Sequence, residues 1–314
     1  MARILVTGGA GYIGSVVVSS LLEKGYEVFV LDNLSKGKAE LVDTRVTFFE
    51  VDLNDYTGVK GIFENNAFDA VIHIAAYKSV GESMVDACKY SDNITGTINL
   101  LRAMVENDVK KIIFSSSAAV YGLPEDGFVT EHTKTEPINF YGFTKLECEK
   151  IIDWFSRVHG IVYVSLRYFN VAGDVLGYVD PDAQNVLPIL METAIGKRDK
   201  FEIYGVDYET RDGTCVRDYV HIIDLVDAHV KALNLENSCF INLGTAKGTT
   251  VKELVSITED VIGKRLDVVF GDEREGDPAF LVASNSEAER LLGWKPKYGI
   301  KDIVESTYLV YKDL

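Results

Sequence analysis

The sequence has few cysteines and histidines, and each shortage excludes a kind of site. Its 314 residues contain four cysteines, Cys88, Cys148, Cys215 and Cys239, and no Cys-x-x-Cys pair. Cysteines scattered in this way favour reduced thiols in the cytoplasm over a disulfide framework or a metal site. The five histidines show no ligand spacing, so no metal is predicted.

Positive charge and long hydrophobic runs are also scarce. The 32 Lys and Arg residues against 48 Asp and Glu residues give a net charge of -16, which argues against nucleic acid or an anionic membrane as a partner. No run is long enough to span a bilayer, and no signal peptide, repeat or linker is predicted. The length predicts a large core and two lobes.

The N-terminal segment has the order of elements that a dinucleotide site requires. Arg3–Thr7 is almost wholly apolar and predicts a strand buried on both faces of a parallel sheet. The run Gly8-Gly-Ala-Gly-Tyr-Ile-Gly14 follows, and an amphipathic stretch to Lys24 predicts a helix. The glycines permit a tight turn beside a pyrophosphate, which the free N–H groups of the helix N-terminus attract. A tight turn without a ligand is the alternative.

Further apolar runs alternate with helical stretches and predict a doubly wound α/β parallel sheet, the Rossmann-type fold. Strands are expected at residues 27–31, 46–51, 70–75, 111–115 and 161–166. Asp32 ends the second strand, where a carboxylate accepts bonds from a ribose and repels a 2'-phosphate, so NAD is favoured over NADP. Lys36 and Lys38 nearby are a mild counter-argument.

Tyr141 and Lys145 lie four residues apart in a predicted helix over residues 139–159, so they share one helical face. A nearby ammonium lowers the pKa of a phenol, and the pair could then move a proton on and off a sugar hydroxyl. Ser117, at the end of the fifth strand, could bond to the same hydroxyl. The alternatives are a surface Tyr beside a solvated Lys, and a Ser that only shapes a turn.

The regular alternation ends near Gly173. We expect a dinucleotide-binding domain at residues 1–172, to which a segment near 210–238 returns, and a smaller C-terminal substrate lobe at residues 173–314. In this lobe a loop is predicted at 174–185, a helix at 186–196 and a strand at 201–204. Arg217 and Arg274 could each clamp a phosphate through two parallel bonds, or could form surface salt bridges.

Several motifs together resemble a known family. The glycine run, the serines ending at Ser117, Tyr141-xxx-Lys145 and Arg167-Tyr-Phe-Asn170 resemble the extended short-chain dehydrogenases/reductases. The more specific motifs resemble the UDP-glucose 4-epimerase family: Lys78-Ser-Val-Gly-Glu-Ser83, Gly205-Val-Asp-Tyr208, Asp212-Gly-Thr214, Val216-Arg-Asp-Tyr-Val-His221 and Arg274-Glu-Gly-Asp277. The resemblance implies NAD as cofactor, UDP-glucose and UDP-galactose as substrates, and a homodimer.

The resemblance also implies roles for individual residues. Tyr141 is then the base, Lys145 its electrostatic partner, and Ser117 an aid to proton transfer. The residues implied to bind NAD are Gly8, Gly11, Tyr12, Ile13, Gly14, Asp32, Asn33, Leu34, Ser35, Lys36, Gly37, Asp52, Leu53, Ile74, Ala75, Ala76, Lys78, Asn93, Ser117, Tyr141, Lys145 and Phe169. Those implied to bind the UDP-sugar are Lys78, Ser117, Tyr141, Asn170, Asn185, Val186, Glu202, Ile203, Tyr204, Arg217, Arg274, Asp277 and Leu281.

The implied reaction oxidises the sugar at C4 to a 4-ketosugar and reduces it on the opposite face. Other nucleotide-sugar enzymes of this fold, among them UDP-N-acetylglucosamine and UDP-uronate 4-epimerases, and a non-catalytic NAD-binding protein remain alternatives. A 4,6-dehydratase needs an Asp-Glu pair beside Ser117, and the sequence has none there. The resemblance also implies that Leu281 limits the size of the sugar that the site accepts. If the family pattern is aligned one residue earlier, Phe280 takes this role.

Overall fold

Seven strands form one sheet among the residues that the computed structural model describes, namely 1–125, 127–179, 183–274 and 276–314. The strands are β1 (Arg3–Thr7), β2 (Glu27–Asp32), β3 (Thr47–Glu50), β4 (Ala70–His73), β5 (Lys111–Ser117), β7 (Val162–Tyr168) and β11 (Cys239–Leu243), in the order β11-β7-β5-β4-β1-β2-β3. β1 pairs in parallel with both β2 and β4, so the winding reverses at β1. Ligands of such sheets bind at the carboxyl ends of the strands near this reversal.

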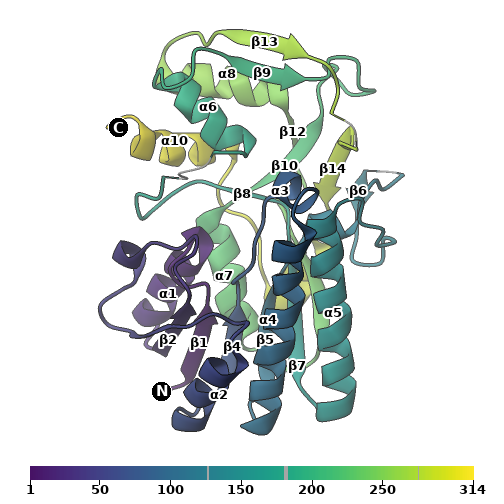
Figure 1. Cartoon of the computed structure of the whole chain (residues 1–314). Coiled ribbons are helices and arrows are strands. Elements are labelled where there is room, and N and C mark those ends of the chain that lie inside the picture. The colour runs from purple at the N-terminus through teal and green to yellow at the C-terminus, as the bar shows by residue number, and fades with distance from the viewer. Residues whose placement is uncertain (126, 180–182, 275) are drawn as a thin grey trace. The chain divides into compact units, whose positions relative to one another are not determined.

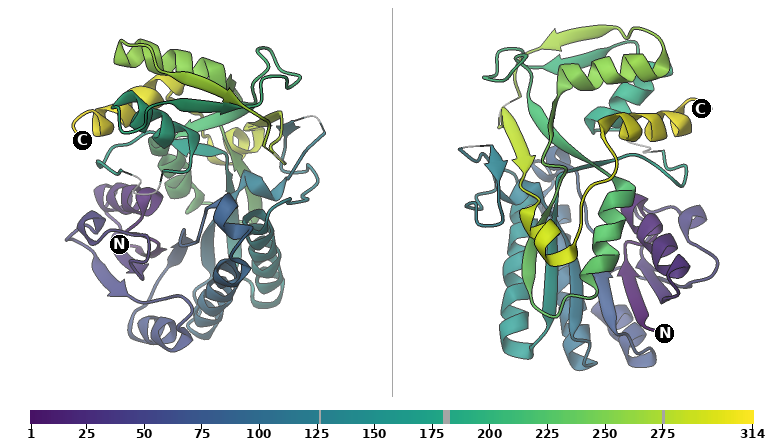
Figure 2. Two further views of the ribbon diagram at one scale, coloured as in Figure 1. Left: turned by 45° about the horizontal axis from the view of Figure 1, so that its top comes forward. Right: turned by 180° about the vertical axis from the view of Figure 1, so that it is seen from behind.

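Helices cover both faces of this sheet (Figures 1 and 2). The face that carries Leu5, Val71 and Ile112 packs against α2 (Tyr56–Asn65), α4 (Ala87–Glu106) and α5 (Phe140–His159). The opposite face carries α1 (Tyr12–Glu23) and α7 (Ile222–Ala232). Short helical turns are η1 (Ala39–Leu41), α3 (Val80–Ser83) and η2 (Ala118–Val120). The predicted doubly wound α/β arrangement is confirmed.

Local signals place two of these elements where the site needs them. The side chain of Asn139 accepts a bond of 2.8 Å from the Gly142 N–H and so begins α5 just before Tyr141. Gly160, at φ 70°, ends that helix in the left-handed conformation. β4 was expected to reach residue 75 but ends at His73, because the N–H groups of Ile74 and Ala75 both turn to the Thr7 carbonyl.

Strands outside the seven-stranded sheet form further sheets (Figure 1), with a separate apolar core. One sheet has the order β12 (Gly248–Thr250), β10 (Val216–His221), β14 (Phe280–Ala283) and β6 (Phe128–Val129), and β8 (Asn170–Ala172) also pairs with β10. β9 (Phe201–Tyr204) pairs with β13 (Val268–Gly271). The helices are α6 (Val186–Ala194), α8 (Val251–Ile262), α9 (Ser286–Leu292) and α10 (Ile300–Tyr311). Buried side chains of α6, α8, β9 and α10 form one apolar cluster.

The chain divides into two units whose boundaries differ from the expected ones. Unit 1 is Met1–Gly122, Thr135–Arg167 and Val226–Ile241; unit 2 is Leu123–Lys134, Tyr168–Leu225 and Asn242–Leu314. Residues 123–134 join unit 2 because β6 pairs with β14, and the segment that returns to unit 1 brings β11 to the sheet edge beside β7. No helix in the described ranges is long and apolar enough to cross a membrane.

Candidate active site

The glycine turn has the geometry of an anion cradle. Gly8 has φ 75°, which side chains rarely adopt, and a Cβ added at Gly14 would lie 2.0 Å from the Gly8 carbonyl oxygen. α1 begins at Tyr12, and its N-cap Gly11 offers no side-chain bond to the first N–H groups. These N–H groups and the positive end of the helix dipole fit a pyrophosphate. The residues present therefore fit a dinucleotide.

Asp32, at the end of β2, is buried and shapes the neighbouring turn. Its carboxylate accepts 3.0 Å from the Ala10 N–H and 2.9 Å from the Leu34 N–H. Burial raises the pKa of this carboxyl above its usual value, although both backbone bonds act in the opposite direction. Asn33 in turn donates 2.7 Å to Asp52. Asp32, the predicted ribose ligand, thus lies beside Asn33 and Asp52, two further residues implied to bind NAD, at the carboxyl ends of β2 and β3.

Lys145 projects from α5 into a buried position with its side chain only 4% exposed. Its Nζ donates 2.7 Å to the Ser115 carbonyl of β5 and lies 4.9 Å from the centre of the Phe114 ring. Burial lowers the pKa of the ammonium from 10.5 to about 8, although Cys148 and Glu149 nearby raise it. The group therefore remains mostly protonated at neutral pH and supplies a fixed positive charge beside β5.

Tyr141 lies in the first turn of α5, and Ser117 is the last residue of β5. The Tyr141 N–H donates 3.1 Å to Ser83 Oγ, a residue of the Lys78–Ser83 motif. One expectation is wrong: burial raises the pKa of the Tyr141 phenol, and the group that lowers this pKa is Ser117 and not Lys145. The reason is that desolvation disfavours the phenolate more than its present partners stabilise it.

Asn93 organises the loop that follows β4. It is buried, accepts 2.9 Å from the Tyr77 N–H, and donates 3.1 Å to the Tyr77 carbonyl and 3.2 Å to Thr144 Oγ1. Thr144 donates 2.8 Å to the Tyr141 carbonyl. The amide that was expected to line the cofactor therefore joins the predicted cofactor loop, residues 74–78, to the helix of Tyr141.

Sequence reasoning missed His73, which lies beneath the same site. Its Nδ1 lies 2.7 Å from Thr7 Oγ1 and its Nε2 3.0 Å from Thr97 Oγ1. The Thr97 hydroxyl donates to the Asn93 carbonyl, so it accepts from His73 Nε2–H, and Nδ1 accepts from Thr7. Burial and, to a smaller extent, the charge of Lys145 lower the pKa of His73 to about 3. The position of His73 at the end of a buried strand was the available signal.

In unit 2, the two predicted phosphate clamps have partners of their own. Arg217 forms an ion pair with Asp277 and donates 2.8 Å to the Val216 carbonyl. The guanidinium carbon of Arg274 lies 3.8 Å from the centre of the Tyr204 ring. Arg217 therefore forms the salt bridge of one interpretation. Its guanidinium is partly exposed, and it is also the group that would clamp a phosphate in the other interpretation. Glu275 and the loop residues 180–182 lie outside the described residues.

The strand register separates Leu281 from Phe280. In the parallel ladder of β10 and β14, Leu281 is the partner of Arg217, and Phe280 is the partner of Val216. Partners in a ladder project to the same face of a sheet, and neighbours along a strand to opposite faces. Leu281 therefore shares a face with Arg217. A Cβ added at Gly127 would lie 2.7 Å from Phe280 Cδ1, so Phe280 packs toward β6.

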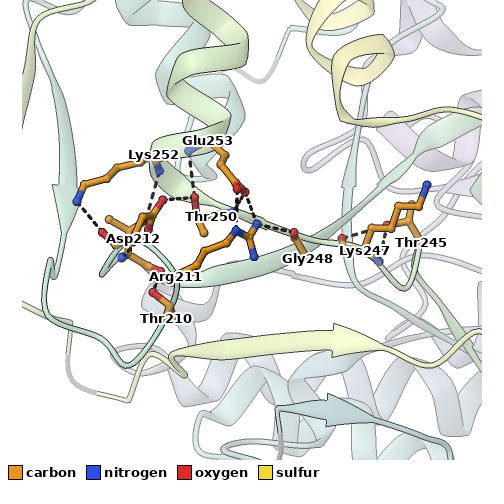
Figure 3. A network of polar contacts seen from close by, with 10 residues as sticks. Thr210, Arg211, Asp212, Thr245, Lys247, Gly248, Thr250, Lys252 and Glu253 are labelled. Atoms are coloured by element: carbon orange, nitrogen blue, oxygen red, sulfur yellow. Dashed lines mark hydrogen bonds and ion pairs between the residues drawn. The ribbon is translucent and has the colours of Figure 1, made fainter.

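The loop before β10 is tied to the start of α8 by a polar network (Figure 3). Asp212 accepts 2.9 Å from the Thr214 N–H and 2.5 Å from Thr250 Oγ1, and its carbonyl accepts 2.7 Å from Lys252. Thr250 and Glu253 form a capping box at α8, and Arg211 pairs with Glu253. This network gives the Asp212-Gly-Thr214 motif a supporting role that spacing alone did not reveal.

Further predicted residues lie in or beside strands and helices of unit 2. Asn170 begins β8, and its neighbour Phe169 donates from its N–H to the Leu243 carbonyl at 3.2 Å. Asn185 is the N-cap of α6 without a capping side-chain bond, and Val186 is the first residue of that helix. Glu202 accepts 2.9 Å from the Tyr204 hydroxyl in β9.

Comparison with known proteins agrees with this geometry. The family model described as GDP-mannose 4,6 dehydratase matches residues 5–307. The UDP-glucose 4-epimerase of Halalkalibacterium halodurans is 44% identical, with 99% of this chain and 96% of that protein covered. The chain belongs to the UDP-glucose 4-epimerase family. The predicted resemblance is thereby confirmed.

Solved structures of this family share the whole fold of the chain. The UDP-glucose 4-epimerase of Brucella ovis in complex with NAD matches with a TM-score of 0.95 at 38% identity, and 99% of each chain is covered. The UDP-glucose 4-epimerase of Thermotoga maritima with UDP-glucose matches with a TM-score of 0.92 at 35% identity, again with 99% of each chain covered.

Proposed function

We propose that this chain interconverts UDP-glucose and UDP-galactose, as an NAD-dependent isomerase that inverts C4 of the sugar through a 4-ketosugar. The observation that carries the proposal is buried Lys145, one turn along the helix from Tyr141, whose Nζ donates 2.7 Å to the Ser115 carbonyl of the strand that ends at Ser117. Family membership supplies the reaction, and Ser117, Tyr141 and Lys145 supply the groups it needs.

NAD, when bound, supplies the reversible acceptor for the hydrogen at C4. The turn from Gly8 to Gly14 and the uncapped start of α1 would hold its pyrophosphate, and Asp32 would hold its adenosine ribose. The Asp32 carboxylate disfavours a 2'-phosphate, so NAD is preferred over NADP. Since the reaction regenerates the cofactor in each turnover, we expect it to be bound tightly.

Proton transfer falls to residues of this chain. Tyr141 takes the proton of the C4 hydroxyl and returns it when the sugar is reduced, and Ser117 supplies a second hydroxyl at the same place. Burial raises the pKa of the Tyr141 phenol and the hydrogen bond of Ser117 lowers it, so Ser117 eases the loss of the phenol proton, and Lys145 adds a positive charge one helical turn away. His73 stays neutral beneath it and adds no second charge.

The nucleotide is anchored by arginines. Arg217 exchanges its bond to Asp277 for the diphosphate, and Arg274 leaves the ring of Tyr204 to do the same. Leu281, on the face of the sheet that carries Arg217, limits the sugar pocket. Leu is smaller than Tyr and larger than Cys, so the unmodified hexoses are preferred and the N-acetyl forms turn over more weakly.

Other activities of the fold fit less well. A 4,6-dehydratase requires an acid pair beside Ser117, where this chain has Ala118 and Ala119. A non-catalytic NAD-binding protein has no use for a Tyr141–Ser117 pair beside a buried Lys145. A UDP-uronate enzyme requires a further clamp for its carboxylate.

We also propose that the chain acts as a cytoplasmic homodimer. Trp154 and Val158 on α5 are 61% and 67% exposed, an apolar outer surface that a second copy would cover. The four cysteines are thiols and not disulfides, which fits a reducing compartment.

One experiment tests the activity and the cofactor together. The purified protein is incubated with UDP-galactose and the UDP-sugars are separated, and a second portion is denatured so that the released nucleotide can be identified. Conversion to UDP-glucose with NAD as the released nucleotide supports the proposal. No conversion, or a release of mainly NADP, refutes it.

A further inference from the structure

Arg167 and Glu149 form an ion pair inside unit 1 that the reaction itself does not use. Arg167 belongs to β7 and Glu149 to α5, and their side chains are 5% and 2% exposed. The guanidinium donates through Nε at 2.9 Å and through Nη2 at 2.7 Å to the two carboxylate oxygens. Such a two-bond fork fixes the orientation of both groups as well as their distance.

The same guanidinium reaches a third segment. Its Nη1 donates 2.9 Å to the hydroxyl of Tyr121, which directly follows the turn η2. The guanidinium carbon also lies 5.1 Å from the centre of the Tyr121 ring and 4.6 Å from that of Phe240. Arg167 thus joins β7, α5 and the segment after β5 through groups that are out of reach of water.

These three segments carry the residues of the proposed chemistry. Glu149 lies four residues after Lys145 and eight after Tyr141 on one helical face. Tyr121 lies four residues after Ser117, whose Oγ accepts 3.2 Å from the Ala119 N–H at the start of the turn. The turn and the helix are also in close contact, since a Cβ added at Gly142 would lie 2.5 Å from the Ala119 carbonyl oxygen.

We propose that Arg167, Glu149 and Tyr121 are positioning residues, which hold the Ser117 turn and the Tyr141–Lys145 helix at the separation that proton transfer needs. The inference rests on the proposed epimerase function. The three residues act through the backbone segments that they join. A pair that served stability alone could be exchanged for apolar side chains of similar volume without harm to turnover.

The test therefore removes the ion pair and keeps the packing. In Arg167→Met/Glu149→Leu both charges are absent, and neither partner is left buried and unpaired. We expect kcat for UDP-galactose to fall about 10-fold or more, since small misplacement of reacting groups is costly. NAD content, the melting temperature and KM should stay close to those of the parent. The matched control is Lys150→Met/Glu147→Leu, an exposed pair on the same helix at 2.8 Å, which should leave kcat unchanged.

Tyr121→Phe is a second and more conservative test, because it deletes only the hydroxyl to which Arg167 donates. We expect a fall in kcat at unchanged KM and melting temperature. Parental kcat in both variants overturns the inference, and so does a fall in kcat accompanied by equal losses of NAD, substrate affinity and melting temperature. If the double variant does not fold, Tyr121→Phe alone decides. A parent enzyme that does not convert UDP-galactose refutes the proposed function instead, so the two failures are distinct.

Discussion

Replacing Lys145 by Met should stabilise the protein while it abolishes turnover. The ammonium has a pKa of about 8 in the folded chain against 10.5 as its ordinary value. At about 1.4 kcal/mol per pKa unit, the charge of Lys145 costs the folded state about 3 kcal/mol at pH 7. Met cannot form the hydrogen bond that Lys145 donates to the Ser115 carbonyl, and the loss of this bond destabilises the variant by about 1 kcal/mol. The expected gain in the free energy of unfolding is therefore about 2 kcal/mol.

The size of the stabilisation by Lys145→Met should depend on pH, and this dependence identifies the charge of Lys145 as its cause. Below pH 8, Lys145 is protonated in both the folded and the unfolded chain, and the folded state bears the full cost. Between pH 8 and 10.5 the folded chain releases the proton first, so the stability of the parent rises with pH. The advantage of Lys145→Met should then shrink across this window.

The assay is urea unfolding of nucleotide-free parent and variant between pH 7 and pH 10, with Lys150→Met as the control on the exposed face of the same helix. Lys150 has a side-chain exposure of 57%, so its replacement should change the unfolding free energy little. A Lys145→Met variant that is less stable than the parent at pH 7, or an advantage that does not change with pH, would refute the reasoning.

Three further substitutions test the site. Tyr141→Phe keeps the ring and deletes the proton-transfer group, so turnover of UDP-galactose should fall about 10²-fold or more with UDP binding retained; parental turnover would exclude Tyr141 as the base. Arg217→Lys keeps the charge and loses the fork, so calorimetry should show weaker UDP binding at unchanged NAD content, and unaltered affinity would leave Arg217 as a partner of Asp277 only. Leu281→Tyr should shift the kcat/KM ratio of hexose to N-acetyl substrates by about 10- to 200-fold toward the hexoses, whereas an unchanged ratio would show that another residue limits the pocket.

Local signals explain what could be predicted from sequence. The glycine turn, the strands of the first sheet and the helix of Tyr141 depend on neighbours within a few residues, such as the cap at Asn139. The pairing of Lys145 with Tyr141 on one face follows from helical spacing alone. These parts of the fold and site therefore appear in the sequence directly.

Residues whose partners lie far away could not be predicted in this manner. Asp218 is fully buried and accepts bonds from Thr245, Ala246 and Ala283, which are 27 to 65 residues distant. His73 has its two partners 66 and 24 residues away. The direction of the Tyr141 pKa shift was missed for the same reason, because it depends on burial by the whole unit and not on the residue four positions along.

The interleaving of the two units along the sequence affects the synthesis of the chain and the choice of fragments that can fold. The second segment of unit 1 ends at Arg167, and its third segment begins only at Val226. This third segment supplies β11, which covers the edge of β7. During translation at about 5–20 residues per second, that edge stays unpaired for several seconds while the intervening residues are added. An uncovered strand edge invites pairing with another nascent chain. For the same reason, a fragment ending at residue 172 would lack its edge strand, and a soluble cofactor-binding fragment must instead carry Val226–Ile241 joined to it.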